Sequence, residues 1–464
     1  MIKANNLILL CAIFIIFKII SIFFTQHDLF GDEAQYWLWS KELDLGYFSK
    51  PPLLPWIIFL VCSVFGNSFF VIKLIPVFFY ILTSYVVFLI SKKLWGNKNL
   101  AALAGLTFFV MPAVSFSSFI LSTDVLLIFF WSMSLLQLLV VLEKPFRINF
   151  IFLGFFVGLA FLSKYAGIYF FLCLFLLFFE KKVRELFYKN IFSFFLFIFV
   201  FLVVVSPNIV WNLNNGWITF DHTADNAALD RINLNFSNGF VFIISQIIMV
   251  GPLIFFAFCF FFNKRLIDDF NNRLLFYFSV PIFLIVFVEG ILVRANANWA
   301  AVSLVAFLIL FVGVVFHSSK KVLSINNLFN LLVGFSFFYL IATSSTIGPF
   351  KRISGVTSLA EDLRSNNINE FGRLVVSDRM LFSNLRFIFY EDPIIFYTPY
   401  KQNSKIGHHF QKTNPLPVGI NKNFIFIGHK EDIIYLENEY KIRLVDKKNY
   451  KFLKNELSVY EVSF

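Results

Sequence analysis

The sequence predicts an α-helical polytopic membrane protein of about eleven transmembrane helices, followed by a small C-terminal α/β domain outside the membrane. Of the 464 residues, 59% are hydrophobic and 14% are charged, whereas a soluble domain has roughly 25% charged residues. A chain this apolar cannot hide its surface inside a water-soluble particle, so lipid must be its main solvent. Long apolar runs alternate with short polar connections, and the composition changes after Gly348.

A membrane-spanning helix needs about 20 mainly apolar residues. The predicted spans are residues 7–24, 69–91, 99–115, 121–142, 149–163, 166–180, 189–211, 239–262, 274–292, 297–316 and 327–347. The run from Leu53 to Phe65 is shorter and contains a proline, so we expect it to lie at the interface or to dip into the membrane. The first run lacks a small-residue cleavage site before Gln26, which favours an uncleaved span over a signal peptide.

Lysine and arginine gather in alternate connections between the spans, as the positive-inside rule requires of cytoplasmic loops. These connections hold Lys92, Lys93, Lys98, Lys144, Arg147, Lys181, Lys182, Arg184, Lys189, Lys264, Arg265, Arg273, Lys320 and Lys321. The pattern predicts a multi-pass membrane protein with a cytoplasmic N-terminus and an extracytoplasmic C-terminal domain. The net charge of +11 is thereby explained as an orientation signal, so membrane lipid is an expected partner and nucleic acid is not.

Two domains are expected. Residues 1–348 form the membrane domain, whose first outer loop is 25–68, and residues 349–464 form the periplasmic α/β domain. In the latter, alternating apolar runs predict strands at Leu374–Val376, Ile394–Tyr397 and Phe424–Ile427. A helix from Arg379 to Tyr390 is expected after Ser377-Asp378.

No metal or cofactor motif stands out. The four cysteines, Cys11, Cys62, Cys173 and Cys259, lie in apolar runs without metal-ligand spacing. The sequence has no glycine-rich phosphate loop, GxSxG elbow or HExxH pair, so nucleotide-dependent chemistry is not supported. We expect no metal site and no cofactor, with a divalent metal as the open alternative.

The strongest candidate site is the first outer loop, where two adjacent carboxylates, Asp32 and Glu33, stand beside the aromatic rings of Tyr36, Trp37 and Trp39. Interfacial preference explains the aromatic rings. It does not explain the carboxylates, which are costly beside an apolar surface unless they are paired or have a catalytic role. We therefore expect catalysis or acceptor binding there, with helix N-capping by Asp32 as the alternative.

Three more charged residues interrupt outer connections. Lys50 precedes two prolines, which stiffen its backbone so that it can meet an anion; an interfacial, snorkelling lysine is the alternative. Asp124 stands at the outer edge of a span, as a catalytic group or a helix cap. Lys164 lies outside the basic inner loops, after a run whose Gly154 and Gly158 permit close helix packing, and we expect it to bind phosphate.

Two further outer loops carry amides and tryptophans, which bind sugars through hydrogen bonds and ring faces. Trp211, Asn212 and Trp217 form one group, although an interfacial position accounts equally well for the tryptophans. The other group is Asn298 and Trp299, close to Arg294, whose guanidinium suits a phosphate or diphosphate.

The outward face thus collects carboxylates (Asp32, Glu33, Asp124), phosphate-binding cations (Lys50, Lys164, Arg294) and candidate substrate contacts (Tyr36, Trp211, Asn212, Trp217, Asn298, Trp299). This set favours transfer of a group from a phospholipid-type donor to an acceptor. A transporter or flippase of lipid-linked sugars is one alternative, although its charges would lie near the midplane. An O-antigen ligase or polymerase and a non-catalytic assembly protein are the others.

Five stretches carry a family resemblance: GDEAQYWLWSKELDLGYFSKPPL, LSTDVLL, GLAFLSKYAG, SPNIVWNLNNGW and RANANW. In this order the chain resembles membrane glycosyltransferases of the GT-C fold, in the dolichyl-phosphate-mannose protein mannosyltransferase-like superfamily. It is most similar to family 39-like bacterial enzymes that add galacturonic acid to lipid A or lipopolysaccharide core, and more distantly to the aminoarabinose transferase of lipid A. VVSDRMLFSNLRFIFY and the later HHF stretch look like that family's C-terminal domain.

The resemblance implies a polyprenyl-phosphate-linked sugar donor, a lipid, glycan or protein acceptor, and inverting transfer at the outer membrane face. It implies that Asp32 is the catalytic carboxylate and Asp124 the second acidic residue. It also implies that Lys164 contacts the lipid phosphate and that Lys50 is the cation before the prolines. Many relatives have an acidic residue where this chain has Ser49, which argues against importing a metal site.

Overall fold

The computed structural model of this chain describes residues 4–227, 232–365, 371–400, 406–420, 422–433, 440–448 and 457–463. The chain forms two compact units. The first comprises Met1–Ile19, Ser49–Leu54 and Ile72–Phe338, and the second Ile20–Phe48, Pro55–Val71 and Tyr339–Phe464. Each unit is described by itself below.

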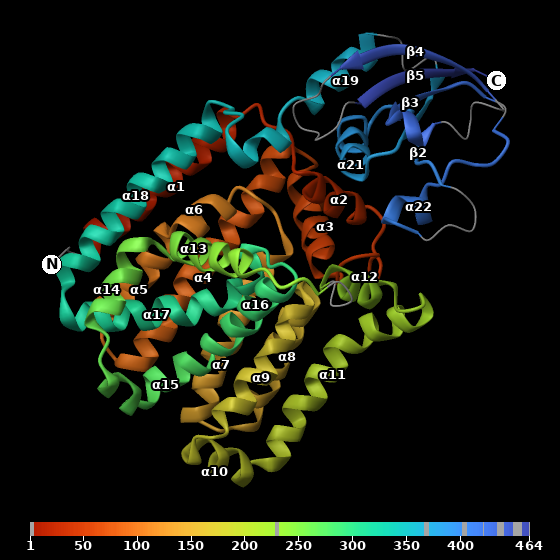
Figure 1. Cartoon of the computed structure of the whole chain (residues 1–464). Helices are drawn as coiled ribbons and strands as arrows, with labels where there is room; N and C mark the ends of the chain where they lie inside the picture. Colours follow the sequence, from red (N-terminus) through yellow and green to blue (C-terminus); the bar gives the residue numbers. More distant parts are fainter. Residues whose placement is uncertain are drawn as a thin grey trace. The chain divides into compact units, whose positions relative to one another are not determined.

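The described residues up to 353 form helices joined by turns and loops (Figure 1). Its α-helices are α1 (Ala4–Phe24), α2 (Gly31–Trp39), α3 (Leu53–Phe65), α4 (Phe69–Trp95), α5 (Lys98–Val110), α6 (Pro112–Ser117), α7 (Thr123–Glu143), α8 (Arg147–Ser163), α9 (Tyr169–Leu177), α10 (Lys181–Lys189), α11 (Ile191–Asn214), α12 (Ile218–Ala227), α13 (Phe236–Val250), α14 (Pro252–Phe261), α15 (Phe270–Tyr277), α16 (Val280–Leu292), α17 (Ala301–Ser318) and α18 (Lys320–Ala342). Short 3₁₀ turns are η1 (Tyr165–Ile168), η2 (Lys264–Asp268), η3 (Ala297–Ala300) and η4 (Gly348–Ile353).

Each predicted span contains an apolar helix, which confirms the polytopic helical class. Within the described residues, 6 helices are long and apolar enough to cross a membrane, or 7 if the bent pair α13–α14 is one span. Five further apolar helices are shorter: Leu9–Phe24, Leu53–Phe65, Lys98–Val110, Arg147–Ser163 and Tyr165–Leu177. Hydropathy alone therefore located the helices but did not reveal which of them are broken.

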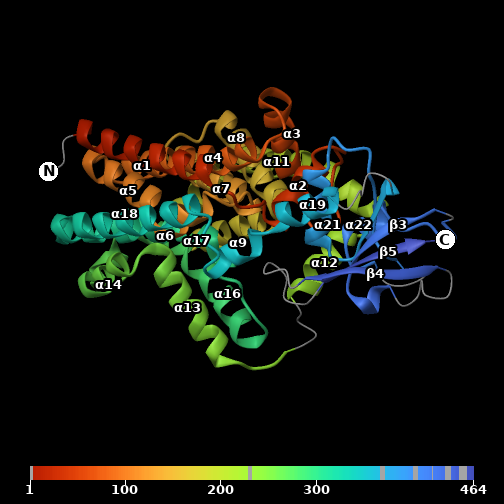
Figure 2. The ribbon, with the colours of Figure 1, turned by 90° about the horizontal axis from the view of Figure 1, so that it is seen from above.

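Two of the predicted spans are interrupted by backbone that cannot continue a helix. The helix pair α13–α14 bends by 99°, and the bend lies at Gly251, whose φ of 110° suits glycine. The next residue, Pro252, begins α14 and lacks an N–H. In the same way α5 ends at Val110 and Pro112 begins α6. Figure 2 shows α13 beside α16, where Phe242 and Phe283 are in ring contact at 5.5 Å.

The glycines of α8 allow its predicted close packing, here against α11. A Cβ atom added at Gly154 would lie 2.5 Å from the carbonyl oxygen of Phe197, and one at Gly158 would lie 2.7 Å from Val204 Cγ1. Only glycine avoids these clashes without moving a helix. α8 ends at Ser163, and Lys164 follows directly.

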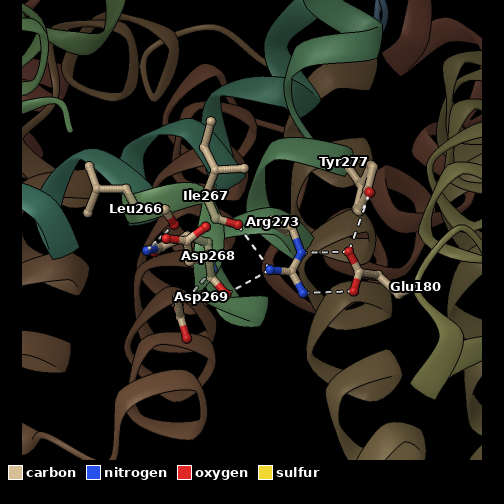
Figure 3. A network of polar contacts seen from close by, with 8 residues as sticks. Glu180, Leu266, Ile267, Asp268, Asp269, Arg273 and Tyr277 are labelled. Atoms are coloured by element: carbon tan, nitrogen blue, oxygen red, sulfur yellow. Dashed lines mark hydrogen bonds and ion pairs between the residues drawn. The ribbon is translucent and has the colours of Figure 1, made fainter. Parts of the chain in front are cut away.

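A partly buried ion pair between Arg273 and Glu180 joins two connections between helices. The charge pattern assigns both connections to the cytoplasmic side of the membrane. Arg273 donates from Nε to Glu180 Oε1 at 2.6 Å and from Nη2 to Oε2 at 2.8 Å (Figure 3). Its Nη1 donates to the carbonyl oxygens of Ile267 and Asp268, and the Tyr277 hydroxyl reaches Glu180. A two-pronged guanidinium–carboxylate pair has a fixed geometry. It therefore fixes α15 against the turn between α9 and α10.

The second unit contains a five-stranded sheet in the order β2-β1-β3-β5-β4. Its strands are β1 (Arg373–Val376), β2 (Ile395–Tyr397), β3 (Phe424–Gly428), β4 (Lys441–Lys448) and β5 (Leu457–Ser463), and its helices are α19 (Val356–Ser365), α21 (Arg379–Ile388) and α22 (His409–Thr413), with a 3₁₀ turn η5 (Lys430–Asp432). β1 pairs in parallel with β2 and β3, whereas β5 runs antiparallel to β3 and β4. The three predicted strands and the predicted helix are confirmed.

The two faces of this sheet bury alternate residues of each strand. Leu374 and Val376 of β1 pack with α19 and α21 on one face, and Val375 packs on the other face with Phe424 and Phe426 of β3. The first-loop helix α2 belongs to this unit, because Leu38 packs against the cluster that holds α21. Trp37 is fully buried and makes edge contacts with Phe387 and Tyr390.

We predict that this unit loses stability in mild acid because of its two adjacent histidines. Burial, together with Lys412 and His408, lowers the pKa of His409 to about 3, and burial and Arg379 lower the pKa of His408 to about 4. The unfolded chain, with an ordinary histidine pKa near 6.5, binds more protons below that pH. Stability therefore falls as the pH drops from about 6.5 towards 3, by up to about 2 kcal/mol for His409 at pH 5.

The measurement is the thermal midpoint of the full chain in detergent at pH 7 and pH 5. His409→Gln should reduce the difference between the two pH values, and the control His429→Gln, in the same unit, should leave it unchanged. Equal pH dependence in the wild type and in His409→Gln would contradict the assignment.

Candidate functional site

Asp124 is held from two sides within the first unit. It occupies the first turn of α7, after the N-cap residue Ser122, whose side chain makes no cap bond. Lys164 Nζ donates to Asp124 Oδ1 at 2.7 Å, and Asn298 Nδ2 donates to Oδ2 at 2.6 Å. The Asp124 side chain is 9% exposed and that of Lys164 is 18% exposed. Both carboxylate oxygens thus have donors, so Asp124 is not the helix cap that was the alternative.

Local breaks in the helices place the two donors. α8 ends at Ser163, and Lys164 adopts extended backbone angles (φ −160°, ψ 138°) before η1. The turn closes when the Gly167 N–H donates to the Lys164 carbonyl oxygen at 2.9 Å. A Cβ atom at Gly167 would lie 2.6 Å from Phe161 N, so the tight return onto α8 requires glycine. Asn298 comes from η3, directly before α17.

Asp124 and Asn298 are among the residues that line a mainly apolar cavity of about 250 Å³. Its walls come from α4, α5, α6, α7, α13 and α17 (Tyr80, Phe108, Met111, Ala113, Val114, Phe116, Ser117, Ile120, Ser122, Ile128, Met249, Ala301 and Leu304). Such a hollow, apolar with a few polar groups in its lining, is the form of a small-molecule or lipid site.

Tyr165, next to Lys164, is fixed by a second polar network. Its hydroxyl donates to Asn208 Oδ1 at 3.0 Å and accepts from Asn212 Nδ2 at 3.2 Å. Its ring stacks on Phe220 with centroids 4.6 Å apart. Asn212, a predicted substrate contact, is fully buried. In this structure it holds Tyr165 in place and so supports the turn that carries Lys164.

Asp32 lies in the second unit, in the first turn of α2. Arg379 Nη1 donates to Asp32 Oδ1 at 2.9 Å, and the same nitrogen donates to Gln35 Oε1. The Asp32 side chain is 53% exposed. It is thus an oriented carboxylate that still faces solvent.

Glu33 has a different environment. It is fully buried, and its Oε2 accepts the Phe30 N–H at 2.8 Å, which closes the first turn of α2. The capping role considered for Asp32 therefore belongs to Glu33, and Phe30 is the N-cap residue. Of the adjacent pair, Asp32 is the carboxylate available for chemistry.

The other predicted cations lie outside the Asp124 cluster, whose described partners are Lys164 and Asn298. Lys50 is half-buried between α2 and α3. Arg294 is exposed and donates to the Asn226 carbonyl oxygen at 3.4 Å. Their roles in phosphate binding stay predictions.

The predicted aromatic contacts differ in burial. Tyr36 is buried against Trp39, and Trp299 packs against the cluster of Phe242, Val286 and Ala300. Trp217 is exposed, with a left-handed φ of 59° and a ring contact to Phe220. Trp211 is half-buried at the end of α11. Trp217 and Trp211 therefore remain candidates for a sugar face.

One contact of the candidate site was not predicted from sequence. Arg379 lies more than three hundred residues from Asp32; its one sequence sign is its position directly after the N-cap Asp378, whose side chain accepts the Leu381 N–H at 2.8 Å. For metals, no group of three or more His, Cys, Asp or Glu side chains is close enough to hold an ion within the described ranges.

Known proteins are similar to this chain in sequence and in fold. A model of the family dolichyl-phosphate-mannose-protein mannosyltransferase matches residues 49–211. The lipid A galacturonosyltransferase RgtD of Rhizobium johnstonii (strain DSM 114642 / LMG 32736 / 3841) is 31% identical over 331 residues, which cover 69% of this chain and 68% of RgtD.

The fold is similar to two crystal structures of ArnT from Cupriavidus metallidurans. The apo form has a TM-score of 0.69 at 15% identity, covering 98% of this chain and 97% of ArnT. The form bound to undecaprenyl phosphate has a TM-score of 0.71 at 14% identity, covering 99% and 98%. The GT-C fold class predicted from the sequence is thereby confirmed. The chain belongs to the GT-C membrane glycosyltransferases of the dolichyl-phosphate-mannose-protein mannosyltransferase-like family, with RgtD as a relative.

Proposed function

We propose that this glycosyltransferase moves a sugar from a polyprenyl-phosphate donor to a hydroxyl of lipid A or lipopolysaccharide core at the periplasmic face of the bacterial inner membrane. The observation that carries the donor class is a single cation, Lys164, paired with Asp124, which lines a mainly apolar cavity. A lipid phosphate needs this combination of apolar wall and cation. The binding of undecaprenyl phosphate by ArnT and the lipid A substrate in the name of RgtD support the same assignment.

In the proposed reaction an acceptor hydroxyl attacks the anomeric carbon of the sugar. A new C–O bond forms, the bond from that carbon to the phosphate oxygen breaks, and polyprenyl phosphate leaves as the anion with inversion at carbon. Asp32 takes the hydroxyl proton, while Arg379 holds one carboxylate oxygen and fixes the direction of the other. Lys164 stabilises the charge that develops on the leaving phosphate.

The test of this function is the mass of the cell's lipid A, core polysaccharide and glycoproteins in a deletion strain carrying plasmid copies of the gene. Wild type should restore one sugar mass on lipid A or core. Asp32→Asn should not, because the amide cannot accept the proton, and purified Asp32→Asn should turn over about 10²–10⁴-fold more slowly.

Glu33→Gln is the matched control for Asp32→Asn, because glutamine keeps an oxygen for the Phe30 N–H and the position is one residue away. It should restore the sugar mass. Normal turnover by well-folded Asp32→Asn would disprove the catalytic role, and a sugar lost from glycoproteins alone would replace the proposed acceptor.

For the donor site, Lys164→Met should raise the KM for a polyprenyl-phosphate sugar by about tenfold or more, since a charge-assisted bond to phosphate is lost. KM and kcat are measured in detergent together with the thermal midpoint. Lys181→Met, at an exposed lysine on α10, is the control and should change neither. A fall in thermal midpoint with unchanged KM would show that Lys164 serves only to neutralise Asp124.

We further propose that transfer needs no divalent metal ion. The negative charge of Asp124 is balanced by Lys164, and that of Asp32 by Arg379. Both Asp124 oxygens have protein donors, and the Arg379 guanidinium donates to one oxygen of Asp32, which supports a reaction without a divalent ion. Prolonged treatment with EDTA should leave turnover unchanged. Loss of turnover that Mg²⁺ or Mn²⁺ restores would instead identify a metal-dependent step.

A further inference from the structure

Two lysines that the reaction above does not use are buried within apolar helices of the first unit. Lys18 of α1 is 2% exposed and Lys73 of α4 is 0% exposed. A charged side chain at membrane depth is costly, and such residues usually serve a function. Although they come from different helices, both ammonium groups are directed at one short segment, Ser115 to Phe119.

The contacts are to the end of α6, where a helix leaves its last carbonyl oxygens without internal partners. Lys18 Nζ donates to the Ser115 carbonyl oxygen at 2.9 Å and to Ser118 Oγ. Lys73 Nζ donates to the Phe119 carbonyl oxygen at 3.0 Å and lies 4.1 Å from the centre of the Phe119 ring. The carboxyl end of a helix carries partial negative charge, so both cations also suit its dipole.

The anchored segment leads directly to Asp124. α6 ends at Ser117 and α7 begins at Thr123, so a few residues separate the Phe119 carbonyl from the carboxylate. Bonds of 2.7 and 2.6 Å to Lys164 and Asn298 leave Asp124 little room to move. The same segment supplies Phe116 and Ser117 to the cavity wall, and Ile120, which follows it, also lines the cavity. A shift of the segment would therefore displace Asp124 and reshape the cavity together.

Stability alone gives a poor reason for keeping two ammonium groups here. Taking an ammonium group out of water costs free energy, even where hydrogen bonds offset part of that cost. What a methionine cannot do is donate a hydrogen bond to a carbonyl oxygen and so fix the position of the main chain. The hydrogen bonds from Lys18 and Lys73 to carbonyl oxygens therefore suit a role in fixing the position of the backbone between Ser115 and Phe119.

We propose that Lys18 and Lys73 are positioning residues that hold the Ser115–Phe119 segment so that Asp124 meets Lys164 beside the cavity. They act through the backbone, without touching the sugar or the phosphate. The inference rests on the proposed role of the Asp124–Lys164 pair in donor binding and transfer.

The main test uses Lys73→Met, with Thr83→Val as the control. Thr83 is fully buried in the same helix, and its hydroxyl donates to the Phe79 carbonyl of that helix. Lys73→Met should lower kcat/KM for a polyprenyl-phosphate sugar by about 10–100-fold, because small misplacements at an active site have effects of this size. Its thermal midpoint should stay near that of wild type. Thr83→Val should change neither quantity.

A double variant separates positioning from general structural support. If Lys73 acts through Asp124, then Lys73→Met adds little to the loss already caused by Asp124→Asn. Multiplied effects, or a lower midpoint with full activity per folded molecule, would overturn the inference. If Lys73→Met does not fold, Lys18→Met tests the same segment from α1, and misfolding of both would show a purely structural role.

The activity of Asp124→Asn alone distinguishes failure of the proposed function from failure of the positioning role. Normal donor KM and kcat in that variant would remove Asp124 from the proposed function. Impaired transfer by Asp124→Asn with normal transfer by Lys73→Met and Lys18→Met would leave the proposed function intact and reject only the positioning role.

Discussion

The hydrogen bonds on Asp124 join three separate parts of the first unit. Through Lys164 and Asn298 this one carboxylate joins the start of α7, the break between α8 and η1, and the turn η3 before α17. A carboxylate and an ammonium that are largely removed from water lose solvation, which their mutual attraction and a further hydrogen bond must offset. The geometry of all three breaks is therefore constrained together.

The contacts of Asp124 with Lys164 and Asn298 explain why the helices are broken at these places. An unbroken helix would satisfy its own main-chain groups but could not present Lys164, Asp124 and Asn298 at its end. Each of the three lies at or beside a helix terminus, where side chains can point along the axis rather than outward to lipid. The glycines at positions 154, 158 and 167 let α8 and its returning turn pack closely enough to hold that arrangement.

In the second unit, too, protein contacts fix the orientation of a candidate carboxylate. Glu33 is buried to close the first turn of α2, and Arg379, from the start of α21, holds Asp32 from outside that helix. Two adjacent carboxylates thus have separate roles, one in the fold and one for chemistry. Because α2 packs on α21, the first loop and the C-terminal sheet form one folded body even though they are far apart in the chain.

The sequence by itself determined the helical membrane class, the positions of the apolar helices and three of the five strands. It also singled out Asp32, Asp124 and Lys164 as site candidates, and their roles stay predictions. The helices and strands follow from local composition, since hydropathy and strand alternation are properties of neighbouring residues. The pairings required the tertiary structure: Lys164 lies 40 residues from Asp124, Asn298 174 residues from it, and Arg379 347 residues from Asp32. No local sequence pattern encodes such partners, because packing decides which side chains meet. For the same reason the sequence did not reveal that Glu33 closes the first turn of a helix, or that Lys18 and Lys73 contact one backbone segment.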